Sequence, residues 1–74
     1  MKINVRLFGI FQIDRFTQQV LEFPAGTRVY EVIDHLSLPP QLFGIVLIND
    51  LHAEVETILH EGDRLALLPL VDGG

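Results

Sequence analysis

The chain has 74 residues, no cysteine, and a formal net charge of −5 from ten acidic and five basic side chains. With 49% apolar and 20% charged residues it has the balance of one small globular domain and not of a disordered segment. The acidic balance argues against nucleic-acid binding, the missing cysteines exclude disulfides and Cys-ligated zinc, and no run approaches transmembrane length, so we expect a cytoplasmic protein without membrane partners.

The first part of the chain predicts a β-hairpin. Ile3, Val5 and Leu7 alternate with polar residues, and this period of two predicts a strand over residues 2–8. Residues 17–23 read as the returning arm of the hairpin.

One helix is predicted next, over residues 28–36. Its apolar residues follow the i, i+3, i+4, i+7 spacing of a single buried stripe: Val29, Val32, Ile33 and Leu36. Thr27 stands where a hydroxyl could cap the helix start, and Leu38-Pro39-Pro40 prevents its continuation.

The second half predicts three strands. Residues 44–48 are apolar after Gly44, so we expect a strand contacted on both faces, followed by a turn at Asn49-Asp50. A weak edge segment is predicted at residues 53–55, and a last strand at 64–71 after the turn Glu61-Gly62-Asp63.

This order of elements indicates an α+β fold: a ubiquitin-like β-grasp roll with a mixed sheet and one main helix. We expect a single domain over residues 1–74, with 72–74 as a flexible C-terminal tail. The predicted core includes Leu7, Leu21, Val32, Ile33, Leu36, Leu65 and Leu67.

Alternation in the last strand predicts an apolar surface on the face away from the helix. If Leu65 and Leu67 face the helix, then Leu68 and Leu70 face outward, and Phe8 joins them from the first strand. Such a patch is typical of a protein–protein contact. The alternative is that the apolar segment 10–16 folds over it.

The most informative feature is Gly73-Gly74, directly behind this strand. Two glycines without Cβ can enter a narrow channel, which makes the carboxylate of Gly74 the first candidate for a reacting group. The plain alternative is a frayed end or a linker remnant.

The last fourteen residues, from Glu61-Gly62-Asp63 through the apolar strand to Gly73-Gly74, resemble the closing segment of the MoaD/ThiS-like sulfur carriers. Three further segments are similar to the same family: Arg6-Leu7-Phe8, residues 23–29, and Leu38-Pro39-Pro40 ahead of residues 45–49. The resemblance spans nearly the whole chain.

The resemblance implies a carrier protein and not an enzyme. Gly74 would be adenylated by an E1-like activating enzyme, and a sulfur donor would convert it to a thiocarboxylate, with Gly73 helping the tail to thread. ATP and magnesium are expected on the activating enzyme, and no cofactor is expected on this chain. Partner contacts are expected at Phe8, Leu68, Leu70, Val71 and Asp72.

The acceptor implied is a synthase such as the molybdopterin synthase large subunit, with a thiazole synthase of thiamine biosynthesis as the alternative. Leu70 and Asp72 depart from the molybdopterin-type pattern, which usually has a second proline and a small residue there, so both branches stay open. Two further hypotheses are a ubiquitin-like modifier joined to its targets through Gly74 and a non-reactive β-grasp interaction module.

Other site patterns are weak. His35, His52 and His60 lack the spacing of metal ligands, so no metal site is predicted. Glu54 and Glu56 would point to opposite faces of an extended segment, which does not support an acid–base pair.

Overall fold

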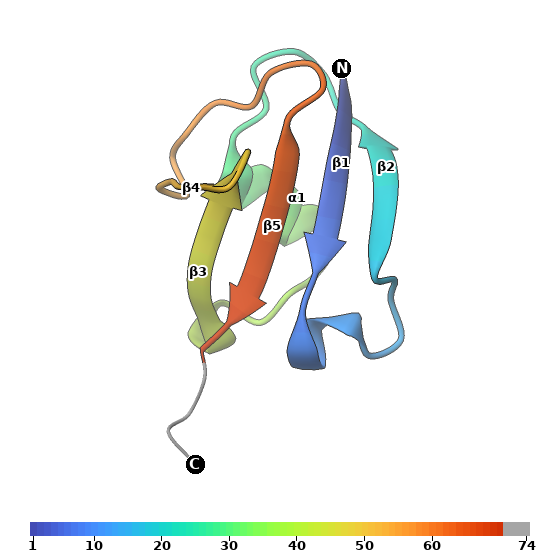
Figure 1. The fold of residues 1–74 in the computed structure, drawn as a ribbon, viewed down its shortest axis with the longest axis vertical. Helices are drawn as coiled ribbons and strands as arrows, with labels where there is room; N and C mark the ends of the chain where they lie inside the picture. Colours follow the sequence, from blue (N-terminus) through green and yellow to red (C-terminus); the bar gives the residue numbers. More distant parts are fainter. Residues whose placement is uncertain (71–74) are drawn as a thin grey trace.

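A computed structural model describes residues 1–70. Five strands form one mixed sheet in the order β2-β1-β5-β3-β4, and a single α-helix lies across one face of it (Figure 1). The central pair β1 and β5 is parallel, and the other pairs are antiparallel. The elements are β1 Lys2–Leu7, β2 Gln18–Glu22, α1 Val29–His35, β3 Phe43–Ile48, β4 Leu51–His52 and β5 Arg64–Pro69, with short 3-10 turns η1 Gly9–Gln12 and η2 Pro40–Leu42. This confirms the predicted β-grasp roll.

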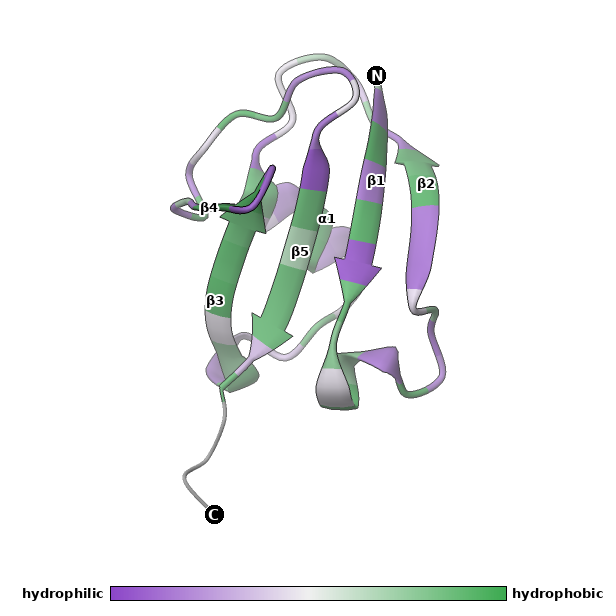
Figure 2. Cartoon of the chain, in the orientation of Figure 1, coloured by the Kyte–Doolittle hydropathy of each residue, from purple (hydrophilic) through white to green (hydrophobic). Residues whose placement is uncertain are grey.

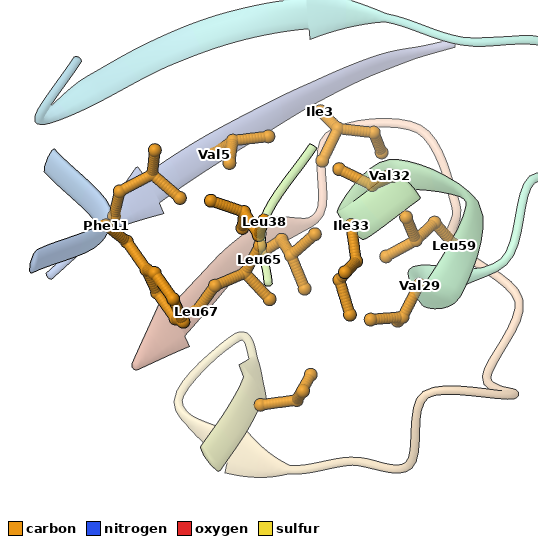
Figure 3. Packing of buried hydrophobic residues seen from close by; sticks show 12 residues of the cluster. Ile3, Val5, Phe11, Val29, Val32, Ile33, Leu38, Leu59, Leu65 and Leu67 are labelled. Atoms are coloured by element: carbon orange, nitrogen blue, oxygen red, sulfur yellow. The ribbon is translucent and has the colours of Figure 1, made fainter. Parts of the chain in front are cut away.

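The core lies between α1 and the inner face of the sheet (Figure 3). The alternation predicted for the central strands holds, because Leu65 and Leu67 are fully buried and Leu7 is nearly so. Val32 and Ile33 face them from α1, whereas Leu21 and Leu36 are only partly buried at the margin of the core. Phe11, Leu38 and Leu59 are also buried, and all three come from segments outside the strands and α1.

Shortening Ile33 to alanine should destabilise the fold by about 2–5 kcal/mol, because the side chain is 9% exposed and its loss leaves a cavity. The matched control is Ile13→Ala, since Ile13 is 62% exposed and its loss should cost less than about 0.5 kcal/mol. Urea unfolding of both variants measures the difference. Equal midpoints would contradict the packing of α1 described above.

The hairpin after β3 turns where the sequence predicts, but the strand that follows is placed differently. Asn49 and Asp50 have φ of 52° and 69°, the positive values that a tight two-residue β-turn requires. The edge strand β4 begins immediately afterwards at Leu51–His52, so the prediction of residues 53–55 was wrong. A two-residue turn brings the chain back into register with β3 at once, which leaves no room for a longer connector.

The strand β3 is covered on one face only, contrary to the expectation of contacts on both. Val46 is buried on the face of the sheet that α1 covers, whereas Ile45 is 39% exposed on the opposite face. A continuous apolar run is therefore compatible here with an open outer face.

The start of α1 is organised by Arg28 and not by Thr27. The backbone N–H of Arg28 donates to the Glu31 carboxylate at 2.9 Å. The Thr27 hydroxyl instead donates backwards to the Pro24 carbonyl at 2.7 Å and is almost fully buried, so the predicted cap was wrong. Thr27 closes the turn that leads into the helix.

The segment of residues 9–16 packs at the end of the core and not over the outer face. Phe11 enters the core beside Leu67, and its ring lies 5.0 Å from that of Phe43 (Figure 3). Arg15 donates to the carbonyls of Leu36 and Ser37 at the end of α1. These contacts hold the segment on the helix side of the sheet. Among residues 1–70, no helix is long and apolar enough to cross a membrane.

Candidate functional site

The outer face of the sheet carries a continuous apolar patch near the end of β5. Strand pairing places Ile45 beside Leu68 and Leu47 beside Ala66. The parallel pairing of Leu7 with Leu67 brings the next residues of the two segments, Phe8 and Leu68, to the same end of the sheet. Figure 2 shows the hydrophobic residues that dominate β3 and the lower part of β5 in this view of the sheet. We call Phe8, Ile45, Leu47, Ala66 and Leu68 the outer patch.

The outer patch is not fully exposed, because its members shield one another. Phe8, Leu47, Ala66 and Leu68 are half-buried, whereas Ile45 is 39% exposed. α1 and the segment of residues 9–16 pack on the opposite side or at the end of the core. Apolar side chains left in this state lose contact with water only when another molecule covers them.

Basic side chains border the outer patch. The guanidinium of Arg6 lies 5.1 Å from the centre of the Phe8 ring, a cation–π arrangement. Arg64, at the start of β5, is paired with Asp50 at 3.1 Å, and both side chains are largely exposed. An exposed pair of this kind contributes little to stability. The border therefore combines the Arg6 cation with a neutral Arg64–Asp50 pair, although the chain as a whole is acidic.

The last described residues leave the sheet at the edge of the outer patch. Pro69 ends β5, and the backbone N–H of Leu70 donates to the Leu42 carbonyl at 2.6 Å. The Leu70 side chain is 59% exposed. Leu70, the last described residue, therefore lies next to the end of the strand that carries Leu68.

The structure therefore brings three of the predicted partner-binding residues, Phe8, Leu68 and Leu70, to one end of the sheet. The other predicted site residues, Val71, Asp72, Gly73 and Gly74, lie outside the described residues. Sequence reasoning did not find Arg6 as a neighbour of the patch. The sequence did contain the information, because Arg6 and Phe8 are two residues apart in the predicted strand and therefore share a face.

Titratable side chains do not gather into a second site in the described part of the chain. Within residues 1–70, no group of three or more His, Asp or Glu side chains is placed to hold a metal ion. His52, His60 and Asp63 line one shallow hollow of about 330 Å³ beside β4. The Asp63 carboxylate is already used there, because it accepts hydrogen bonds from the His60 backbone and the Asn49 amide.

Comparison with known proteins agrees with this fold. The sequence profile of the ThiS family matches residues 5–74 and so includes Gly73-Gly74. The chain belongs to the ThiS family. It is accordingly a ubiquitin-like sulfur carrier of the MoaD/ThiS type. No curated protein sequence matches it significantly.

Three solved structures share the fold along the full chain. SAMP1 from Haloferax volcanii has a TM-score of 0.78 at 24% identity, with 100% of both chains covered. A putative molybdopterin converting factor subunit 1 from Pyrococcus furiosus has a TM-score of 0.79 at 22% identity, covering 96% of this chain and 99% of that one. A subunit in the complex of molybdopterin-converting factor subunits 1 and 2 from Helicobacter pylori has a TM-score of 0.68 at 23% identity, with 100% of both covered. At these identities the likeness establishes the β-grasp fold.

Proposed function

We propose that this ThiS family member carries sulfur as a thiocarboxylate on Gly74 and donates it in molybdopterin biosynthesis. The observation that carries the proposal is the family match, which extends through Gly73-Gly74, the third and fourth residues after Leu70. Four residues follow Leu70, and four extended residues reach at most about 14 Å. A partner that covers the outer patch could therefore place an active site within reach of Gly74.

The chemistry requires no catalytic side chain on this protein. The Gly74 carboxylate attacks the α-phosphorus of ATP and pyrophosphate leaves, which forms an acyl adenylate on an E1-like activating enzyme. A sulfide-level sulfur from a donor then displaces AMP and yields the thiocarboxylate. The activating enzyme supplies ATP binding and magnesium, and the carrier supplies an unhindered terminus.

The acceptor that we propose is the large subunit of a molybdopterin synthase. In the Helicobacter pylori structure, subunits 1 and 2 of the molybdopterin-converting factor form a complex, and one chain of that complex has this fold. The outer patch fits such a partner because it is apolar at its centre and polar at its border, the usual anatomy of a protein–protein interface.

Transfer to a thiazole synthase in thiamine biosynthesis is the second candidate, favoured by the match to the ThiS profile itself. The two routes can be separated genetically by replacing the chromosomal copy with one that lacks Gly74. We expect loss of molybdoenzyme activity without a thiamine requirement. A thiamine requirement with normal molybdoenzyme activity would support the second candidate.

Intact mass spectrometry of the protein purified from its own cells tests the thiocarboxylate directly. Replacement of one terminal oxygen by sulfur should add about 16 Da, the same increment as oxidation of Met1, so the shift must be localised to the last peptide. Alkylation with iodoacetamide should remove the ambiguity, because the chain has no cysteine and a thiocarboxylate sulfur reacts readily. A terminal peptide found only as the free acid, or extended beyond Gly74, would contradict the proposal.

A further inference from the structure

At the end of the sheet that carries Phe8 and Leu68, the central strand β5 extends two residues beyond its pairing with β1. Its neighbour β1 stops at Leu7, opposite Leu67, and β3 changes register between Phe43 and Ile45. Pro69 therefore lies beyond the pairing with β1, and it pairs with Phe43 of β3 only after the register shift. This explains how a proline fits in a central strand, because its nitrogen has no hydrogen to donate.

Gly44 lies against the backbone on one side of this point. A Cβ atom at Gly44 would be 2.8 Å from the Pro69 carbonyl oxygen and 3.0 Å from the nitrogen and Cα of Leu70. The φ of Gly44 is not among the positive values in the structure, so glycine is required here for space and not for conformation. The close approach coincides with the register shift in β3 and with the 2.6 Å hydrogen bond from Leu70 to the Leu42 carbonyl.

Gly9 lies against Pro69 from the η1 side. Its φ of 58° turns the chain away from the sheet after Phe8, and a Cβ there would be 3.1 Å from Cγ of the Pro69 ring. The approach is less tight than at Gly44, and it involves a ring that can pucker. Pro69 is thus held between two backbone segments that come close because both present a glycine.

We propose that Gly9 and Gly44 are positioning residues for the chemistry at Gly74. They let η1 and β3 close around Pro69 and Leu70, so that the tail starts from a fixed point beside the outer patch. This inference rests on the proposed function, because a fixed starting point matters only if the tail must reach a partner's active site. Reactions lose rate steeply when a reacting group is displaced by about 1 Å.

The test is Gly44→Ala, compared with the wild type in ATP–pyrophosphate exchange by the activating enzyme of the same organism. The added methyl cannot fit without moving Pro69 and Leu70, so kcat should fall about tenfold or more. The KM for the carrier should change less than kcat, because none of the five outer-patch side chains is altered and only Leu70 beside them moves.

The matched control is Gly62→Ala, which removes a glycine with φ of 81° at the other end of β5, where a Cβ meets nothing within 4 Å. It should lower the unfolding midpoint but leave kcat unchanged.

Amide hydrogen exchange gives a second readout that is independent of activity. In Gly44→Ala the Leu70 amide should exchange faster, because its bond to the Leu42 carbonyl is disturbed, while the Leu65 and Leu67 amides keep their protection. If Gly44→Ala does not fold, Gly9→Ala takes its place in both measurements. Unchanged exchange of the Leu70 amide would contradict the close packing of Gly44 against Leu70. Unchanged kcat, with an active wild type, would contradict the positioning role of Gly44. A wild type that supports no exchange would instead refute the proposed function, and the positioning role with it.

Discussion

Deleting Gly74 is expected to abolish adenylation and sulfur transfer while leaving the fold intact. The deletion draws the terminal carboxylate back by about 3.5 Å, and displacements well below that cost about 100-fold in rate. The described core ends before Leu70, so unfolding should change by less than about 0.5 kcal/mol. ATP–pyrophosphate exchange measures the first effect, and thermal unfolding measures the second.

Extending the chain by one residue beyond Gly74 is the companion variant. It keeps both glycines but moves the carboxylate, so it should fail as completely as the deletion. Exchange at the wild-type rate by either variant would show that this carboxylate is not the reacting group. The protein would then be better described as a β-grasp interaction module.

Placing a charge at two adjacent positions of β5 should separate folding from docking. Leu67 is fully buried, so Leu67→Asp puts a carboxylate into the core and should cost roughly 4 kcal/mol or more, enough to unfold a domain of this size. Leu68 belongs to the outer patch, so Leu68→Asp should cost only about 1 kcal/mol and keep the fold. Circular dichroism and urea unfolding distinguish the two variants.

The same Leu68→Asp chain should bind its partners poorly. Removing an apolar contact at the centre of an interface costs about 2 kcal/mol, roughly 30-fold in Kd, and a desolvated charge adds to this loss. Calorimetric titration against the activating enzyme or the acceptor subunit measures it. Leu68→Ala, which removes the contact without adding a charge, should show a smaller loss in the same direction. A folded Leu68→Asp variant with unchanged affinity would exclude the outer patch as the docking surface.

The Arg6 side chain beside the outer patch helps to interpret the affinity of the Leu68→Asp variant. Arg6 stacks on Phe8, so an aspartate at position 68 lies on the same face as a cation and not beside an unpaired carboxylate of the outer patch. Any loss of affinity then reflects the missing apolar contact and the cost of desolvation. Repulsion within the carrier itself would not explain it.

The amino-acid sequence by itself determined the kinds of element and the faces that they bury. The alternation of Ile3, Val5 and Leu7 and the helical spacing of Val32 and Ile33 are local patterns, and every one of these side chains is buried in the structure. The turn at Asn49-Asp50 was equally predictable, because few residues tolerate positive φ. Gly73-Gly74 could likewise be identified as a candidate reacting terminus, because that prediction depends only on residue type and order.

Tertiary structure decided which segments meet. The parallel pairing of β1 with β5 brings Phe8 to Leu68 and Gly9 to Pro69, although about sixty residues separate them. Periodicity likewise does not predict that Phe11 packs in the core, that β4 begins at Leu51, or that Gly44 lies against Pro69 and Leu70. Local patterns report only how a residue relates to its neighbours in the chain, whereas register between distant strands depends on the packing of the whole core. The proposed role of the tail could therefore be predicted from the sequence, and the point from which the tail starts could not.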